Sequence, residues 1–297
     1  MSARRYTLRA GALELDVLPA VGGSIARFDV LGPEGRQPLL RGTKADYTDV
    51  LDAACFPLLP FVNRIRGGSF ECDGRKIHLA SNLAGDASPL HGQGWRAAWS
   101  VESVQDDQIE LVYQHHASDW PWRYESRQRI VLLPGGLLIE LSCRNLSVRP
   151  MPCGLGLHPC FPCTQETLLD TEVMNAWTAD ADNLPLAKVA ATGRYALRRR
   201  LVCAQGLDNG FDGWGGAARI AWPERGLVLQ FFSADAAYFQ LYSPLAGGFF
   251  AAEPAQHANA ALNAPQHQWE ALGIRLLAPG ESRRLTVRFT ASWVQRP

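Results

Sequence analysis

The sequence lacks the features that mark membrane, secreted and nucleic-acid-binding proteins. No run of about 18 consecutive apolar residues occurs, and the first eleven residues, MSARRYTLRAG, contain no apolar signal-peptide segment. The 29 basic residues are balanced by 29 acidic ones, so the positive excess that drives binding to nucleic acid is missing. We therefore expect a cytoplasmic protein that binds neither membranes nor nucleic acid.

A helical period sustained over three turns is also missing, whereas alternation of apolar and polar residues is common. It is clear in Leu13–Val17, Ile109–Tyr113 and Leu285–Phe289, and such alternation is typical of half-buried strands. Residues 128–141 and 219–232 each read as a hairpin around a Pro- and Gly-containing turn. These patterns predict antiparallel pairing of neighbouring strands.

Linkers, low-complexity tracts and internal repeats are missing as well, and the 27 glycines and 19 prolines are spread over many turns. We therefore expect one domain over residues 1–297. The predicted fold class is all-β, a large antiparallel β-sandwich or super-sandwich.

The seven cysteines are odd in number and spread from Cys55 to Cys203, whereas a secreted disulfide framework normally has an even number in a shorter chain. Reduced, buried thiols are the favoured interpretation. Cys153, His158, Cys160 and Cys163 lie within PCGLGLHPCFPC and could supply a zinc set, but prolines keep this stretch extended. Zinc and a disulfide therefore stay as minor alternatives to inert thiols on a strand, and no metal or other cofactor is expected.

Two side chains in apolar surroundings are candidates for acid–base chemistry. His158 follows Gly154 and Gly156 and precedes a proline, so a rigid strand end would hold its imidazole, which suits a proton donor. Glu253 follows the apolar run Phe249–Ala252, and a carboxylate with a raised pKa is a good general base. A core histidine and a water-facing glutamate are the alternatives.

Polar residues in the irregular segments are candidates for sugar binding. Asn63 and Arg64 stand between apolar residues, and such an arginine needs a carboxylate or hydroxyl groups as partners. His91 precedes a Gly-Gln-Gly turn, while Asp208 and Trp214 belong to a loop-like segment that mixes carboxylates with aromatic rings. Aromatic faces beside polar groups are typical of sugar sites, although turn residues are an equally good reading.

Taken in chain order, these segments resemble the aldose 1-epimerase (mutarotase) family over roughly Leu13 to Val294. The matching pieces are Asn63-Arg64-Ile65, Leu90-His91-Gly92, Leu157-His158-Pro159-Cys160-Phe161, Leu207-Asp208-Asn209 with Gly213-Trp214, and Glu253-Pro254 with His257 and Leu262-Asn263. Cys160 stands where tyrosine is common in the family. In this respect the sequence resembles a divergent branch of that family.

The resemblance implies a galactose mutarotase-like sandwich that interconverts the α and β anomers of a hexose. It also implies that Glu253 is the general base, that His158 is the general acid and that His91 is the second active-site histidine. Arg64 and Asp208 would bind sugar hydroxyls, with Asn63 and Trp214 beside them.

Other functions stay open from the sequence. A hexose 6-phosphate substrate would call for basic residues at the pocket mouth, where Arg66, Arg96 and Lys76 are candidates. A glycoside hydrolase could use Asp208 with Glu253, and a sugar-binding protein of the same fold would not catalyse at all. The sequence does not distinguish a monomer from a homodimer.

Overall fold

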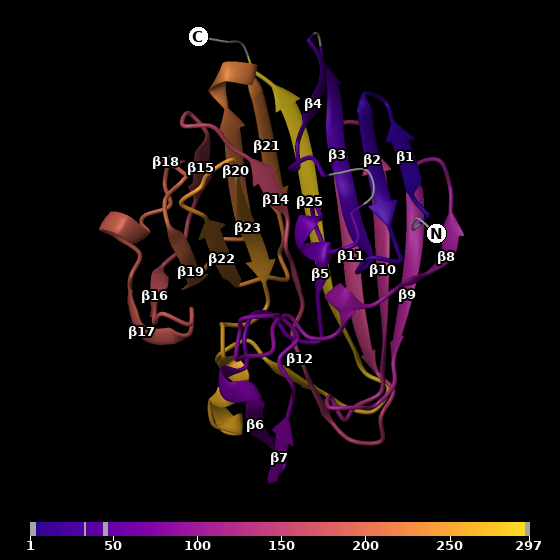
Figure 1. The fold of residues 1–297 in the computed structure, drawn as a ribbon, viewed down its shortest axis with the longest axis vertical. Coiled ribbons are helices and arrows are strands. Elements are labelled where there is room, and N and C mark those ends of the chain that lie inside the picture. The colour runs from indigo at the N-terminus through magenta and orange to yellow at the C-terminus, as the bar shows by residue number, and fades with distance from the viewer. Residues whose placement is uncertain (1–3, 33, 44–46, 295–297) are drawn as a thin grey trace.

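The computed structural model describes residues 4–32, 34–43 and 47–294 as strands joined by turns and 3₁₀ segments (Figure 1). The remaining residues of the expected domain, 1–3, 33, 44–46 and 295–297, lie outside the described part. Within the described ranges no helix is long and apolar enough to cross a membrane.

The largest sheet has nine antiparallel strands and forms one layer of the molecule. Its order is β18 (Arg200–Leu201), β15 (Leu168–Thr171), β20 (Ala217–Trp222), β21 (Leu227–Phe232), β25 (Ser282–Trp293), β11 (Gly136–Asn145), β10 (Tyr124–Leu133), β9 (Gln108–His115) and β8 (Ser100–Val104). Both predicted hairpins are present, since Leu133 pairs with Gly136 and Trp222 pairs with Leu227. Burial alternates along most of these strands, as expected for a sheet with one face in the core.

Two further sheets cover the inner face of this layer (Figure 1). One is the order β17 (Pro185–Ala190), β16 (Asn175–Ala179), β19 (Leu207–Asp212), β22 (Tyr238–Ser243), β23 (Phe249–Ala255), β13 (Gly156–Leu157) and β5 (Pro57–Leu58), with β14 (Cys160–Pro162) also paired to β23. The other is β1 (Tyr6–Ala10), β2 (Leu13–Leu18), β3 (Ser24–Gly32) and β4 (Gly35–Pro38). Two small hairpin-like pairs lie at one end: β6 (Ser69–Cys72) with β7 (Arg75–His78), and β12 (Met151–Cys153) with β24 (Arg275–Leu277).

Aromatic side chains join the two layers. Phe231 of β21 lies 5.9 Å from Phe161 of β14 and 6.4 Å from Phe239 of β22, measured between ring centroids. All three rings are at most 1% exposed, and each fully buried ring of this size stabilises the fold by about 1.5–3 kcal/mol. The predicted all-β antiparallel sandwich is therefore confirmed.

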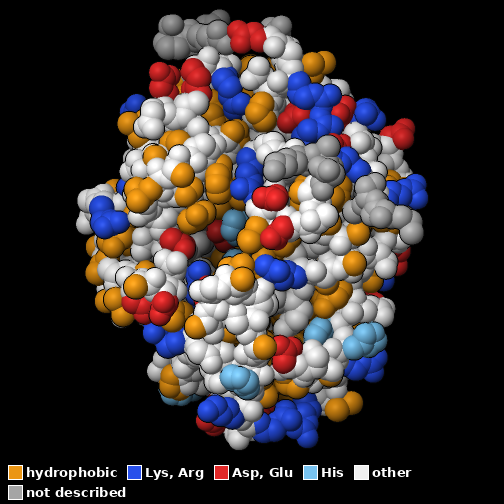
Figure 2. All heavy atoms as spheres, viewed as in Figure 1, with side chains coloured by type: hydrophobic (Ala, Val, Ile, Leu, Met, Phe, Trp, Pro, Cys, Tyr) orange, Lys and Arg blue, Asp and Glu red, His pale blue; other side chains and the backbone are white. Residues whose placement is uncertain are grey.

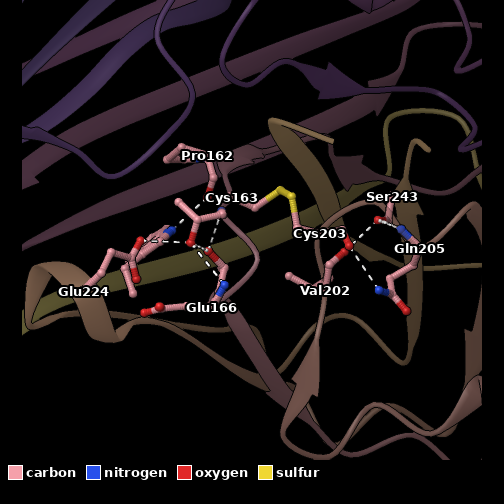
Figure 3. The surroundings of a disulfide bond; sticks show 11 residues. Pro162, Cys163, Glu166, Val202, Cys203, Gln205, Glu224 and Ser243 are labelled. Atoms are coloured by element: carbon pink, nitrogen blue, oxygen red, sulfur yellow. Dashed lines mark hydrogen bonds between the residues drawn. A yellow bond between two sulfur atoms is a disulfide. The ribbon is translucent and has the colours of Figure 1, made fainter. Parts of the chain in front are cut away.

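The cysteines are only partly as expected. Cys55, Cys72, Cys143, Cys153 and Cys160 are free and buried, which confirms the reading of inert thiols for these five. For Cys163 that reading is wrong, because it forms a disulfide with Cys203, 40 residues further along the chain (Figure 3). Disulfides are rare in cytosolic proteins, so the cytoplasmic prediction did not anticipate this bond.

The bond also removes Cys163 from the zinc set considered above. It ties the chain just after β14 to the chain just before β19, beside the buried hydroxyl of Ser243, which donates to the carbonyl of Val202 (2.6 Å; Figure 3). A cross-link that closes a 40-residue loop restricts the unfolded chain, and such bonds typically contribute about 2–4 kcal/mol.

Candidate active site

A cavity of about 390 Å³ opens between the irregular segments 56–64 and 83–91 and strands β14, β19, β22 and β23. Two other hollows, of about 290 and 260 Å³, lie over the nine-stranded sheet; the first has a mixed apolar and polar lining, and the second is lined mainly by charged residues. Figure 2 shows a hollow near the middle of one face in which histidine side chains are recessed, with basic and acidic side chains around it. The volume and the mixed polar and aromatic lining are typical of a small-molecule site.

Glu253 and His158 face each other in this cavity. Glu253 lies within β23, a strand that is buried almost throughout, and only 2% of the residue is exposed. Its Oε1 is 3.3 Å from Nε2 of His158, and its Oε2 has no hydrogen-bond partner among the described residues. A buried oxygen without a partner costs free energy, so this carboxyl group destabilises the fold unless a ligand or a proton satisfies Oε2.

The break between β13 and β14 holds His158 in place. Its backbone N–H donates to the carbonyl of Phe56 (2.9 Å), and its ring stacks on the Phe56 ring with centroids 4.4 Å apart. The Sγ of Cys160 lies 3.5 Å from Nδ1. The imidazole is therefore fixed on one face and on one nitrogen, while Nε2 points to Glu253.

Burial shifts both groups toward their neutral forms. It lowers the pKa of His158 to about 3, with the charge of Arg41 acting in the same direction. Burial also raises the pKa of Glu253 well above its usual range, supported by the charge of Asp208 and opposed by Arg64. Both shifts favour the uncharged forms, a carboxyl group beside a neutral imidazole, over the ion pair, and two groups this close titrate as a coupled pair.

His91 and Asn63 support each other through two hydrogen bonds. The N–H of Asn63 donates to Nδ1 of His91 (3.0 Å), and the N–H of His91 donates to the carbonyl of Asn63 (2.9 Å). Both residues have positive φ angles, 57° and 60°, a conformation that non-glycine residues adopt mainly where the surroundings impose it. Because Nδ1 accepts, the neutral ring carries its proton on Nε2.

Arg64 and Asp208 complete the polar lining. Nε of Arg64 donates to Asp86 (2.8 Å) and its Nη1 donates to Oδ1 of Asn63 (3.1 Å), so the expected carboxylate partner of this arginine is present. Asp208 lies in β19, and its Oδ1 accepts a hydrogen bond from Nε2 of Gln240 (2.5 Å). Burial raises the pKa of Asp208, against the effects of Arg64 and Gln240.

The structure thus brings six of the seven predicted site residues to one cavity, and Trp214 is the exception. Its ring lies 5.3 Å from the ring of Phe239 in the core, and its Nε1 donates to the Thr171 hydroxyl (2.8 Å). The predicted sugar-stacking role of Trp214 is therefore withdrawn. His257 is also structural: its Nε2 accepts from the N–H of Val62, and its Nδ1 donates to the carbonyl of Ala258.

The basic residues proposed for the pocket mouth do not line the cavity. Arg66 donates to Asp180 and to the carbonyl of Pro185, Arg96 lies over the Trp95 ring, and Lys76 is exposed on β7.

Sequence reasoning missed several lining residues, and the ones that matter below are Arg41, Gln240, Tyr242 and Phe249. The alternation of β22 could have indicated Gln240, which pairs with Glu253 in the register of the sheet.

His91, His158 and Glu253 are close enough together to be considered as metal ligands, because one ligand atom from each lies within 4.8 Å of the others. A metal needs a nitrogen lone pair that faces it. The Nδ1 lone pair of His91 is occupied by the N–H of Asn63, so Nε2 presents a hydrogen instead. This arrangement suits a hydrogen-bond donor to an oxygen atom better than a metal ligand.

Comparisons with known proteins agree with this site. The family model for aldose 1-epimerase matches residues 4–290. The uncharacterized protein YphB of Escherichia coli K12 is 33% identical over 97% of this chain and 99% of its own length. A crystal structure of a candidate aldose 1-epimerase from the same organism superposes with a TM-score of 0.89 at 32% identity, covering 98% of this chain and 99% of the other.

A galactose mutarotase-like protein from Clostridium acetobutylicum shares the fold, with a TM-score of 0.86 at 19% identity over 98% of this chain and 95% of the other. The family match spans almost the whole chain and includes every residue that lines the cavity. The chain therefore belongs to the aldose 1-epimerase family.

Proposed function

We propose that the protein is an aldose 1-epimerase that interconverts the α and β anomers of a hexose by opening and closing the ring. The observation that carries this proposal is the pair formed by Glu253 and His158, 3.3 Å apart in the largest cavity described. Ring opening removes a proton from the C1 hydroxyl and adds one to the ring oxygen. Both oxygens are bonded to C1, so a base and an acid that lie side by side can reach both.

In the proposed reaction, Glu253 takes the proton from the C1 hydroxyl while His158 gives one to the ring oxygen. The open aldehyde then rotates about the C1–C2 bond, and both transfers run in reverse on its other face. Each cycle moves the pair between carboxylate with imidazolium and carboxyl with neutral imidazole. The pair holds one proton in both states, and burial favours the second, uncharged state.

The other polar groups have roles in binding. Nε2–H of His91 can donate to an oxygen of the sugar, and the carboxylate of Asp208 can accept from a hydroxyl while Gln240 fixes its position. Arg64 and Asn63 are locked to each other and to Asp86, which keeps their free donors and acceptors aimed at the cavity. Preorganised hydrogen-bonding groups of this kind orient a substrate with little entropic cost.

Substitution of the pair tests the proposal directly. We expect Glu253→Gln and His158→Asn each to lower the rate of anomer exchange at least about 100-fold, because each positioned acid or base typically contributes about 10²–10⁴-fold. Polarimetry or NMR exchange on freshly dissolved α-glucose and α-galactose measures that rate. Exposed residues of the same types give matched controls, Glu71→Gln and His267→Asn, which should leave it unchanged.

Two results would contradict the proposal. Wild-type turnover retained in both active-site variants would remove the acid–base assignment. Release of reducing sugar from aryl glycosides would instead indicate hydrolysis by Asp208 and Glu253, and binding without exchange would indicate a sugar-binding protein.

A further inference from the structure

Arg41 stands at one end of the cavity and is held there by the strand that follows His158. Its backbone N–H donates to the carbonyl of Cys160 (2.8 Å), and its guanidinium lies over the Phe249 ring, 4.5 Å from the centroid. Phe249 and Tyr242 line the same end of the cavity, with their ring centroids 6.1 Å apart. The cation is therefore fixed against an aromatic wall rather than free to swing into solvent.

The hydrogen bonds of Arg41 leave one side of the guanidinium open. Nε donates to the carbonyl of Ala53 (3.0 Å), and Nη2 donates to the carbonyls of Ala53 (2.8 Å) and Leu51. Within the described ranges, the two hydrogens on Nη1 have no acceptor and the group has no carboxylate partner. Three bonds to neutral carbonyls orient the group without cancelling its charge.

The second arginine of the cavity differs in this respect. Arg64 is paired with Asp86 at 2.8 Å, with side-chain exposures of only 12% and 13%. Asp86 largely neutralises its charge, so a neutral sugar hydroxyl is enough to satisfy its remaining hydrogen-bond donors. Among the described residues, no carboxylate matches the charge of Arg41 and no acceptor binds its two Nη1 hydrogens. An oxyanion satisfies such a group best, because Arg forms strong, directional bonds to carboxylate and phosphate.

The position of Arg41 relative to the reacting pair indicates which part of a sugar it meets. Arg41 is hydrogen-bonded through its backbone to Cys160, two residues after His158. Asp208 is instead hydrogen-bonded to Gln240, which lies opposite Glu253 in the sheet. With the C1 hydroxyl on Glu253 and the ring oxygen on His158, the sugar must place C5 beyond the ring oxygen. The substituent on C5 then points to the end of the cavity where Arg41 lies.

We propose that Arg41, with Phe249 and Tyr242 beside it, forms a subsite for an anionic oxygen-bearing group on C5 of the aldose. The proposal rests on the proposed function, since it uses the sugar orientation that the acid–base pair imposes. The shared chemistry is a singly or doubly charged oxyanion at C6, either a carboxylate or a phosphate ester. Sugars that end in a neutral CH₂OH leave the charge of Arg41 without a partner.

The first test compares three sugars by NMR anomer exchange: glucose, glucuronate and glucose 6-phosphate. We expect kcat/KM for at least one anionic sugar to exceed that for glucose about tenfold or more at low salt, with the better of the two identifying the anion. In Arg41→Gln the ratio of anionic to neutral kcat/KM should fall about 10- to 100-fold, mainly through KM. Arg41→Lys should retain part of the preference for the anionic sugar. Arg96 is a cation outside the cavity, so Arg96→Gln should retain the full preference.

The second test separates this subsite from the proposed catalysis. Calorimetric titration of Glu253→Gln with glucose 6-phosphate and with glucuronate measures binding without turnover, and the double variant with Arg41→Gln should bind about tenfold or more weakly. If wild type and Arg41→Gln both exchange the anomers of charged and neutral sugars at equal rates, the subsite is overturned. That result does not contradict the epimerase proposal. Anion binding that depends on Arg41 without anomer exchange supports the subsite and overturns the catalysis.

Discussion

Asp16 and Glu253 are two carboxyl groups buried to almost the same extent, with exposures of 3% and 2% on strands β2 and β23. Their pKa values nevertheless shift in opposite directions. Burial alone would raise the pKa of Asp16, but hydrogen bonds from Arg27 and Thr7 outweigh burial and lower it. Burial raises the pKa of Glu253 well above its usual range, and its neighbour Asp208 adds to the effect.

The difference lies in the partners. Asp16 accepts from Nε of Arg27 (2.8 Å), from the Thr7 hydroxyl (2.7 Å) and from Arg5 (3.1 Å), so all of its charge is matched. Within the described ranges, Glu253 has one close polar contact, from Oε1 to Nε2 of His158, and its Oε2 has no hydrogen-bond partner. Satisfied carboxylates stabilise a fold, whereas an unsatisfied one is able to take and release a proton during a reaction.

The two groups therefore contribute to stability at opposite ends of the pH scale. The lowered pKa of Asp16 means that its contribution is present above the pKa of the unfolded chain and is lost as the pH falls. The raised pKa of Glu253 means that stability is present at low pH and is lost as the pH rises through the folded-state value. Each prediction below changes a partner or a charge in the surroundings of Asp16 or of Glu253.

The largest expected effect comes from removing the cation that matches the carboxylates of the four-stranded sheet. Arg27→Gln leaves Glu14, Asp16 and Asp29 facing one another without their shared partner, and Asp16 and Asp29 are nearly fully buried. We expect a loss of about 2–4 kcal/mol in the free energy of unfolding, measured by urea denaturation at pH 7.

Arg36→Gln is the matched control, because Arg36 contacts two of these carboxylates, Glu14 and Asp29, but its side chain is 50% exposed. It should cost less than about 1 kcal/mol, and the cost should shrink in salt. Equal losses in the two variants would show that burial does not decide the strength of this cluster.

Removing the charge of Glu253 should increase the free energy of unfolding, in contrast to the loss expected for Arg27→Gln. Glu253→Gln keeps the shape of the side chain but removes the ionisation that burial opposes, so we expect the variant to be more stable than wild type by about 1–3 kcal/mol at pH 8. Near pH 4 wild-type Glu253 is protonated, and the difference should vanish. Thermal unfolding at both pH values measures it, with exposed Glu71→Gln as the control. A variant that is less stable at pH 8 would mean that Glu253 is satisfied after all.

The fold could be predicted from the sequence because its signal is local. Alternation in Leu13–Val17, Ile109–Tyr113 and Leu285–Phe289 corresponds to β2, β9 and β25, and turn chemistry located both hairpins. The disulfide could not be predicted in this way. Its two cysteines are 40 residues apart, and only the tertiary fold brings together the chain after β14 and the chain after β18.

The site was predictable where a polar residue interrupts an apolar segment, as at His158 and Glu253. Trp214 was misplaced because Leu207–Asp212 reads as a loop but forms β19, after which the chain turns the indole into the core. Arg41 was missed because nothing near it in the sequence marks it. Its role depends on a backbone hydrogen bond to Cys160, about 120 residues away along the chain.

The smallest expected effect is a shift in the pH dependence of anomer exchange. The reactive pair must hold one proton, so kcat/KM should follow a bell with an acid limb near the His158 pKa of about 3 and an alkaline limb set by Glu253. Asp208→Asn removes one of the causes that raise the pKa of Glu253, so the alkaline limb should move to lower pH. Asp212→Asn changes a carboxylate four residues along the same face of β19, where Asn175 and Lys188 bind it, and should leave the limb in place. If the limb stays in place or moves upward in Asp208→Asn, the charge of Asp208 does not act on Glu253, and burial alone then sets the pKa that separates this carboxyl group from Asp16.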